Sequence, residues 1–272
     1  MTNILDNIIA HKQKEVADKS SLIPVKLLEQ STYFASKTVS MKQNIIDPEK
    51  SGIIAEFKRK SPSKGLINGA VSPEKVSIGY MQAGASALSI LTDSEFFGGS
   101  NQDLQIARKF NFCPILRKDF VIEEYQIIEA KSIGADAILL IAAALSPEKL
   151  KSLALFAKSL GLEVLLEVHN QLELETSLCD EVDLVGVNNR NLKTFEVNIE
   201  TSLTLVEKIP DNFLKISESG ISSPESLLKL RNAGFDGFLI GENFMKTSRP
   251  EQAAYNFIRD FRRMLQGQGE GK

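Results

Sequence analysis

Eight short segments rich in β-branched and aliphatic residues recur along the chain, each followed by a polar loop and a helical pattern. They comprise residues 52–57, 87–91, 114–116, 137–141, 164–167, 184–187, 214–217 and 238–240. Strands that alternate with helices are typical of a parallel sheet whose crossovers cover both faces. Eight such units are the number in a closed (β/α)8 TIM barrel, for which about 250 residues is usual. The pattern therefore predicts this α/β fold.

The stretches between these segments have the spacing and end signals of helices. In residues 123–133, Tyr125, Ile128 and Ile133 approximate one apolar face. A Ser-Pro-Glu sequence, which suits an N-cap followed by Pro at the first helical position, opens three other stretches. These are residues 72–74, 146–148 and 223–225. Glycine, which suits a helix C-cap, precedes the next strand at Gly84, Gly134 and Gly234.

The first 50 residues precede the repeat and add helices to it. Residues 3–19 and 25–30 have helical patterns, and no linker divides the chain. We therefore expect one barrel domain over residues 1–272, with residues 1–50 as an N-terminal helical extension packed on it. An open doubly wound sheet is the alternative, but no Gly-x-Gly-x-x-Gly follows the first strand.

Composition narrows the class of protein. The 272 residues carry 32 Lys and Arg against 35 Asp and Glu, so no basic excess favours a nucleic acid partner. Two Cys and two His without Cys-x-x-Cys argue against an all-protein zinc site. The longest apolar runs, such as residues 137–145, are far shorter than the ~20 residues of a membrane span. No secretory signal opens the chain, and we expect a cytoplasmic protein.

Charged residues at the end of the first strand are candidates for chemistry. Side chains alternate along a strand, so Glu56 and Lys58 share a face with Ile54, and we expect both in the barrel mouth. A structural ion pair is the alternative role, because either charge would be costly to bury alone. The loop 58–65 holds four cations, which suits a lid that attracts phosphate or carboxylate, or simply a solvated basic loop.

Further polar residues stand where other apolar strands stop. Lys118, Glu167 and the segment 188–190 each mark a strand end, and in a barrel these ends converge on one rim. A buried Lys and Glu there can exchange protons near neutral pH. Glycine-bearing turns at residues 217–221 and 240–243 follow the seventh and eighth strands, where barrels often bind phosphate.

The ordered set of motifs around these residues resembles one known family. The segments are IAEFKRKSPS at 54–63, LSILTD at 88–93, FFGGS at 96–100, PILRKDF at 114–120, LEVH at 166–169, GVNNR at 186–190 and SESGI at 217–221. Together they closely resemble indole-3-glycerol phosphate synthase, a barrel of the tryptophan pathway. The similarity runs from the first helix to Gly241 and beyond.

The resemblance implies a reaction that needs no cofactor and no metal. The family converts 1-(2-carboxyphenylamino)-1-deoxyribulose 5-phosphate to indole-3-glycerol phosphate, carbon dioxide and water. The ring carbon that bears the carboxylate attacks the ribulose carbonyl while an acid protonates the carbonyl oxygen. Loss of carbon dioxide restores the ring electrons, and loss of hydroxide then needs an acid and a base. A phosphorylated small molecule is the implied partner.

The resemblance also implies roles for individual residues. Lys118 corresponds to the general acid and Glu167 to the second acid-base group, with Glu56 and Lys58 in the same catalytic set. Lys58 is placed to bind the substrate carboxylate and to share the proton work, so its division of roles with Lys118 stays open. The implied substrate-binding residues are Asn188, Arg190, Glu218 and the apolar walls Phe97 and Phe120. The implied phosphate-binding residues are Ser61, Ser219, Gly220 and Gly241.

One position departs from the family pattern, and three other residues are expected to have structural roles. Glu242 stands where many members have Ser, and we expect its side chain to turn away from the phosphate. His11 is expected on an exposed helix face, His169 in a loop contact and Phe195 in core packing. A monomer or weak homodimer is expected.

Two alternatives remain for function. An isomerase barrel of the same pathway would use a Cys and Asp pair, but Cys113 lies at the wrong end of its strand. A barrel that binds a phosphorylated metabolite without turning it over would not need the matched Lys and Glu residues. Ligand binding without turnover would favour this second alternative.

Overall fold

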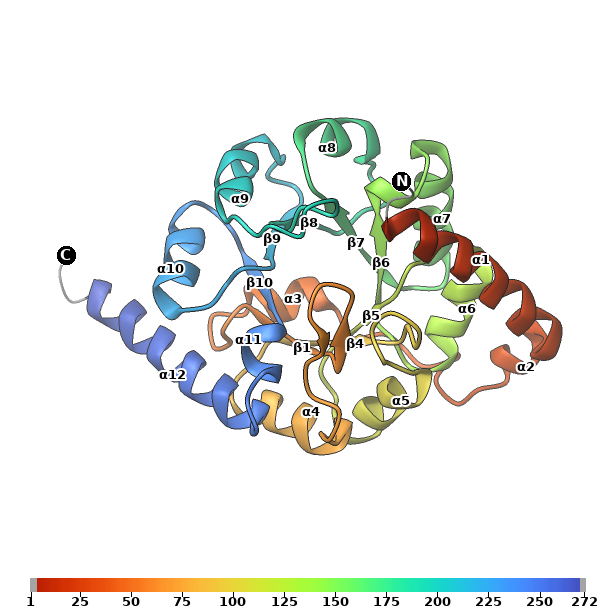
Figure 1. The fold of residues 1–272 in the computed structure, drawn as a ribbon, viewed down its shortest axis with the longest axis horizontal. Helices are drawn as coiled ribbons and strands as arrows, with labels where there is room; N and C mark the ends of the chain where they lie inside the picture. Colours follow the sequence, from red (N-terminus) through yellow and green to blue (C-terminus); the bar gives the residue numbers. More distant parts are fainter. Residues whose placement is uncertain (1–3, 270–272) are drawn as a thin grey trace.

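Eight parallel strands form a ring at the centre of the structure, and helices surround them (Figure 1). The computed structural model describes residues 4–269. The barrel strands are β1 (Ile53–Phe57), β4 (Ala87–Leu91), β5 (Ile115–Lys118), β6 (Ala137–Ile141), β7 (Glu163–Val168), β8 (Leu184–Asn188), β9 (Leu214–Glu218) and β10 (Gly237–Ile240). Each strand pairs with the next, and β10 pairs with β1, so the barrel is closed. The predicted (β/α)8 fold is confirmed.

The helices follow the strands as the sequence pattern predicts. They are α4 (Pro73–Gln82), α5 (Asn101–Phe110), α6 (Glu124–Ser132), α7 (Pro147–Ser159), α8 (Gln171–Ser177), α9 (Glu200–Leu205), α10 (Pro224–Asn232), α11 (Glu242–Met245) and α12 (Pro250–Gly269). Short 3₁₀ turns η1 (Ala142–Ala144) and η2 (Val206–Lys208) follow β6 and α9. The β1–α4 loop contains a small hairpin, β2 (Lys60–Ser61) and β3 (Gly65–Leu66), which the sequence analysis did not predict.

In the part of the chain that the structure describes, three helices precede β1, and they cover two different parts of the barrel. α1 (Ile4–Leu22) and α2 (Val25–Glu29) match the two predicted extra helices, and residue 3 of that prediction lies outside the described residues. α3 (Met41–Ile46) was not predicted. Its Met41 and Ile45 pack on the apolar residues that fill the barrel interior, and α3 lies behind the strands in Figure 1.

The N-terminus of α3 is held by a strand residue. Glu163, at the start of β7, accepts hydrogen bonds from the Met41 and Lys42 amides at 2.7 and 3.0 Å. The Ser40 hydroxyl donates to the same carboxylate at 2.5 Å. A carboxylate is favourable at a helix N-terminus, because the first amides there have no partner within the helix. This contact fixes α3 across the end of the barrel opposite the C-terminal strand ends.

Alternation along β1 separates two apolar regions. Ile53, Ala55 and Phe57 pack outward in the cluster between the strands and the helices. Ile54 points inward with the residues that fill the barrel, so Glu56 shares the interior side. The predicted facing of Glu56 toward the barrel interior is therefore confirmed.

The predicted apolar face of residues 123–133 was only partly right, because Ile133 is buried but Tyr125 and Ile128 are half-buried. Ile127 and Ala130 of α6 are fully buried, whereas Tyr125 is only half-buried. The reason is that α1 and α2 also pack near α6: the Tyr125 hydroxyl donates to the carbonyls of Lys19 and Ile23. A helix covered on two sides has no single apolar stripe.

The predicted end signals are confirmed. Serine hydroxyls accept amide hydrogen bonds as N-caps, with Pro in the first turn, at Ser72, Ser146 and Ser223. The C-terminal glycines Gly84, Gly134 and Gly234 have φ of +97°, +93° and +110°. Such values favour glycine, because a Cβ would be strained there. Within residues 4–269, the structure contains no helix with the length and apolar character needed to span a membrane.

Candidate active site

A pocket opens at the C-terminal ends of the barrel strands. Its floor and walls include apolar residues of the strands, among them Leu139, Ile141 and Leu239. Ile4, Leu5 and Ile8 of α1 line one side, so the N-terminal helix completes the pocket. In Figure 1 the first turn of α1 reaches over the barrel near β6. The extension before the repeat therefore contributes directly to the site.

Lys118 lies between two carboxylates on this floor. Its Nζ is 2.7 Å from Glu167 Oε2 and 3.3 Å from Glu218 Oε2. Burial opposes the charge of Lys118, but Glu167, Glu218 and Glu56 outweigh it and raise the pKa of the ammonium. Burial likewise disfavours ionised Glu167, yet Lys118 and His169 hold the pKa of Glu167 well below its usual range. The pair is therefore charged at neutral pH.

The surroundings of Glu218 raise the pKa of its carboxyl, whereas those of Glu167 lower it. Burial raises the pKa of its carboxyl to about 7, and the nearby Glu167 and Glu56 add to this, although Lys118 lowers it. The carboxyl fits there because Gly186 on β8 has no side chain, and a Cβ at that position would collide with it. The Lys118 ammonium and the Glu218 carboxyl, which differ in proton affinity, therefore lie side by side.

Glu56 and Lys58 form a second ion pair at the mouth. Lys58 Nζ is 2.6 Å from Glu56 Oε1, and the Lys58 side chain keeps 17% of its surface exposed. A Cβ at Gly241 would collide with the Glu56 carboxyl, so the glycine after β10 makes room for it. Lys58 has one carboxylate partner here, compared with two for Lys118, and it lines both the pocket and the adjoining groove.

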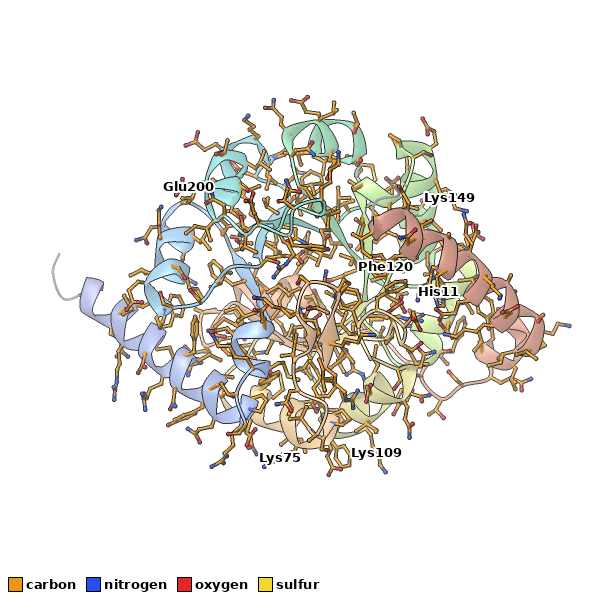
Figure 2. All side chains as sticks on the ribbon, viewed as in Figure 1. His11, Lys75, Lys109, Phe120, Lys149 and Glu200 are labelled. Carbon is orange, nitrogen blue, oxygen red and sulfur yellow. The ribbon has the colours of Figure 1, made fainter. Side chains whose placement is uncertain are left out.

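Two phenylalanines form an aromatic wall. Phe97 and Phe120 both line the pocket, and their ring centroids are 5.8 Å apart with an interplanar angle of 39°. In Figure 2 the labelled Phe120 lies inside the ring of helices, whereas Lys75, Lys109, Lys149 and Glu200 lie at the periphery. A planar ring fits this wall by dispersion and apolar burial.

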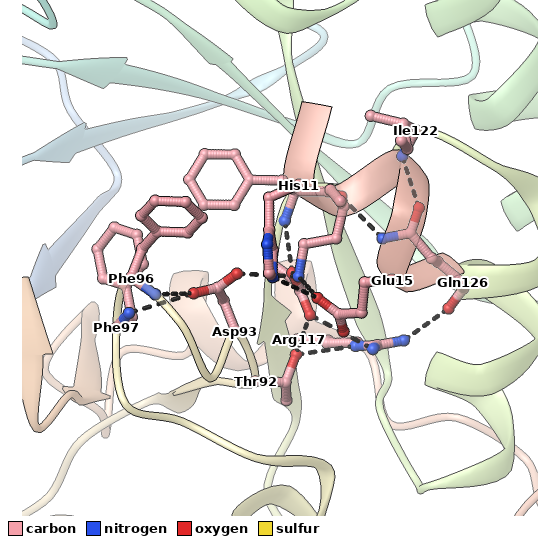
Figure 3. Close-up of polar contacts among 12 residues, drawn as sticks. His11, Glu15, Thr92, Asp93, Phe96, Phe97, Arg117, Ile122 and Gln126 are labelled. Carbon is pink, nitrogen blue, oxygen red and sulfur yellow. Dashed lines mark hydrogen bonds and ion pairs between the residues drawn. The ribbon is translucent and has the colours of Figure 1, made fainter. Parts of the chain in front are cut away.

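A buried charge cluster holds this wall in place (Figure 3). Lys12 of α1 is 1% exposed, and its Nζ contacts Glu15, Asp93 and Asp119 at 2.8, 2.9 and 2.9 Å. Asp93 accepts from the Phe97 amide at 3.2 Å, and Asp119 accepts from the Phe120 amide at 2.8 Å. Lys12 therefore links the N-terminal helix to both loops that carry the aromatic wall.

Arg117 extends the same cluster behind the strands. It is fully buried, ion-pairs with Glu129 of α6 and lies 3.4 Å from Asp119. Its Nε donates to the Thr92 hydroxyl, which donates to Asp119 at 2.5 Å. Burial disfavours ionised Asp119, but Arg117 and Lys12 hold its pKa down to about 2. Each buried charge thus has a partner of opposite sign.

The groove beside the pocket contains the residues expected to bind phosphate. Ser61 lines the pocket, Ser219 lines both spaces, and Gly220 and Gly241 line the adjoining groove. Ser219 has φ of +67°, a strained value for a residue with a side chain. Such strain is often found at binding sites. Lys64 and Lys246 add positive charge to the same groove.

The expectation for Glu242 was wrong. Its side chain does not turn away but lies in the wall of both spaces, 3.3 Å from Arg190 Nη2 and 4.0 Å from Lys64 Nζ. The physical reason is that two cations, Arg190 and Lys64, flank the carboxylate and attract it. Arg190 Nη1 also donates to Ser63 Oγ and to the Phe195 carbonyl, both at 3.3 Å.

Comparison with known proteins identifies the family. A family model described as indole-3-glycerol phosphate synthase matches residues 5–257. The chain belongs to this family. A relative named "Indole-3-glycerol phosphate synthase" from Bacteroides thetaiotaomicron is 50% identical over 259 residues, covering 95% of this chain and 99% of the relative. Relatives of the same name from Polaromonas naphthalenivorans and Dechloromonas aromatica are each 42% identical, covering 92% of the chain and 96% and 97% of themselves.

A solved structure shares the fold. The structure titled "Native KDPGal structure" has a TM-score of 0.56 and 14% identity, and the match covers 80% of this chain and 96% of that one. At that identity the likeness shows the barrel architecture alone. Membership of the indole-3-glycerol phosphate synthase family rests on the sequence matches.

The structure brings together most residues that the synthase motifs singled out. The pocket is lined by Glu56, Lys58, Ser61, Phe97, Lys118, Phe120, Glu167, Asn188, Arg190, Glu218 and Ser219. Phe195 also lines it, so its placement in core packing was wrong; the Phe195 backbone has φ of +59°, and the residue lies in the loop after β8. His11 keeps 41% of its side chain exposed, as expected, with its ring edge on Phe96.

Two polar residues that support this synthase pocket from outside its lining were missed by sequence analysis. Lys12 was not singled out, because a charged residue in an amphipathic helix normally faces water. His169 was given only a loop contact, although its position two residues after Glu167 on an alternating strand end was a usable signal. Its Nε2 lies 3.4 Å from Glu167 Oε1.

Proposed function

We propose that this pocket is where the chain closes the indole ring of indole-3-glycerol phosphate, with Lys118 as general acid and Glu167 as the second acid-base group. The observation that carries the proposal is the placement of Lys118 between Glu167 and Glu218 beside an aromatic wall. The chain is a carboxy-lyase of the synthase family, so the substrate is 1-(2-carboxyphenylamino)-1-deoxyribulose 5-phosphate.

The pocket has a suitable group for each part of that substrate. Phe97 and Phe120 offer an apolar surface for the benzene ring, and Lys58 at the open side offers a cation for its carboxylate. Asn188 and Arg190 lie where they can orient the ribulose chain. We assign the phosphate to Ser61, Ser219, Gly220 and Gly241, whose spaces adjoin the pocket.

The proton steps follow from the charges. Lys118 is protonated at rest, so it gives its proton to the carbonyl oxygen as the ring carbon attacks. Decarboxylation releases carbon dioxide and returns an electron pair to the ring. The hydroxyl then leaves as water after taking a second proton, and the neighbouring ionised Glu167 takes up the carbon-bound proton whose loss restores the aromatic indole. The Glu167 proton can return to Lys118, so each turnover consumes one proton from solvent. Atoms balance without any oxidant or reductant.

Replacing Lys118 tests the assignment. Lys118→Met should lower kcat by about 10²- to 10⁴-fold, the usual contribution of one acid-base group. Product is followed by indole fluorescence, which the chain barely obscures because it contains no Trp. Lys151→Met, on the exposed face of α7, is the matched control and should leave turnover unchanged.

Each other result has a defined meaning. Turnover that survives in Lys118→Met would transfer the acid role to Lys58. Substrate binding without turnover by the folded parent would support the alternative of a barrel that binds a phosphorylated metabolite.

Four expectations from the sequence stay proposals. We propose that residues 1–272 form one domain, that the protein is a cytoplasmic monomer or weak homodimer, and that it binds no nucleic acid. Light scattering after size-exclusion chromatography measures the mass against 30.0 kDa for one chain. A concentration-independent mass of two chains or more would overturn the oligomeric expectation.

A further inference from the structure

The β7–α8 turn builds a chain of ionisable groups that ends at Glu167. His169 Nε2 lies 3.4 Å from Glu167 Oε1, and its Nδ1 lies 3.1 Å from Glu173 Oε2 on the first turn of α8. The His169 amide also donates to Glu173 Oε2 at 2.8 Å. The imidazole therefore lies between two carboxylates, with a hydrogen-bonding contact to Glu173 and a longer ion-pair contact to Glu167, and this setting favours its doubly protonated form.

Glu173 is itself fixed by the start of α8. Asn170 caps this helix: its side chain accepts from the Glu173 amide at 2.9 Å and donates to Glu173 Oε1 at 2.7 Å. Both carboxylate oxygens of Glu173 are thus occupied, and one of them faces the ring. The His169 side chain keeps only 10% of its surface exposed, so the ring has little freedom to turn.

The ring lies behind Glu167, outside the substrate pocket. His169 does not line that pocket but lines an adjoining groove with Asn170, Glu173 and Asn188. Lys118 approaches Glu167 Oε2, whereas His169 approaches Oε1. The carboxylate is therefore held from two sides, and only the Lys118 side faces substrate.

We infer that His169, oriented by Glu173, is a positioning residue that keeps Glu167 ionised and correctly turned for its proton transfer. This inference rests on the proposed role of Glu167. Burial works against a charged ring, but Glu167 and Glu173 raise the pKa of His169 to about 9. The ring is then a cation across the neutral range, so it stabilises the Glu167 anion while Lys118 gives up its proton.

Other charged groups around the ring belong to the same balance. Lys118, Glu218 and Glu56 lie beyond Glu167 on β5, β9 and β1. Asp6 of α1 and Arg190, Lys193 and Glu196 of the β8–α9 loop line the adjoining groove. The contacts to the imidazole nitrogens given above come from Glu167 and Glu173, so these two carboxylates are the residues to substitute.

Kinetics of His169→Phe and Glu173→Gln test the inference. His169→Phe should lower kcat on the order of 10-fold, less than loss of a direct acid-base group, with KM within about two-fold. The acidic limb of its kcat profile should move to higher pH, because Glu167 loses a neighbouring cation. Glu173→Gln should also lower kcat and move the acidic limb to higher pH, each by less than His169→Phe does. Glu175→Gln, exposed on the same helix, should change neither.

His169→Gln separates charge from orientation. Its amide can reach toward Glu167 without a charge, so kcat should partly recover while the acidic limb stays shifted. An unchanged kcat and acidic limb in folded His169→Phe would overturn the inference. If that variant fails to fold, Glu173→Gln retains the ring and decides the question by the same two quantities.

The proton affinity of the ring gives a readout independent of turnover. The chain has two His, so His11→Phe leaves one imidazole resonance for titration by NMR. His169 should titrate near pH 9 and fall toward its ordinary range in Glu173→Gln; titration below about pH 7 would overturn the pairing. If Glu167→Gln turns over normally while His169 in the parent titrates with a raised pKa, the proposed role of Glu167 is refuted, whereas the pairing of His169 with its carboxylates stands.

Discussion

Lys12 connects the N-terminal helix to the barrel, and its removal should be severe. Lys12→Met keeps most of the apolar stem of the side chain but leaves the buried Asp93 and Asp119 without their ammonium partner. Removing one member of a buried ion pair typically costs about 3–5 kcal/mol, because the remaining charge is desolvated and unpaired. Asp119 keeps Arg117 and Thr92, so most of the cost should come from Asp93.

Urea unfolding followed by circular dichroism measures this cost. We expect the free energy of unfolding to fall by about 3–5 kcal/mol, which for this length corresponds to a melting point lower by about 5–10 °C. Lys14→Met, exposed on the same helix, should cost less than about 0.5 kcal/mol. Equal effects of the two substitutions would refute the reasoning.

A double variant isolates the charge from the packing. Lys12→Met with Asp93→Asn removes both the cation and the carboxylate it leaves behind, so it should be more stable than Lys12→Met alone. Coupling energies for contacting residues are about 0.5–3 kcal/mol, and we expect a value in the upper part of this range. Simple additivity would show that Lys12 and Asp93 do not act as a pair.

Two further predictions concern the charges of the mouth and of the β7–α8 turn. Glu242→Gln removes the carboxylate that pairs with Arg190 and Lys64, so an incoming phosphate no longer competes with it. Inhibition by inorganic phosphate should therefore strengthen about 2- to 5-fold, within the range of exposed ion pairs. Weaker inhibition would contradict this prediction. The folded-state pKa of His169, about 9, exceeds its unfolded value of about 6.5, so the stability it provides is complete below pH 6.5 and is lost as pH rises to 9. Urea unfolding at stepped pH should show this decline in the parent and not in His169→Phe.

The fold was predictable because its signals are local and repeated. Apolar segments of strand length, Ser-Pro-Glu caps and C-terminal glycines each report on a few neighbouring residues, and eight repeats reinforce one another. The boundaries were less predictable. Strand β5 runs to Lys118 and β9 to Glu218, beyond the predicted ends at 116 and 217, because polar side chains that meet partners inside a barrel mouth do not end a strand.

The features that the sequence did not predict depend on residues that meet only in the folded chain. α3 is six residues long, too short for a periodic pattern, and its position is set by Glu163 from β7. Lys12 looks like a solvated charge until Asp93 and Asp119 surround it. Glu242 was expected to avoid the phosphate groove, but Arg190 attracts it. In each case a distant partner of opposite charge or polarity decided the outcome.

The arrangement of partners bears on the division of roles between the two lysines. The substrate brings a carboxylate and a phosphate, so cations must be free to meet both. Lys58 has one buried carboxylate partner, Glu56, so exchanging that pairing for the substrate carboxylate would leave a single buried carboxylate unpaired. Lys118 is held by Glu167 and Glu218 deeper in the pocket, where exchanging partners would strand two buried carboxylates. This asymmetry supports Lys58 as the anion-binding group and leaves Lys118 for proton transfer.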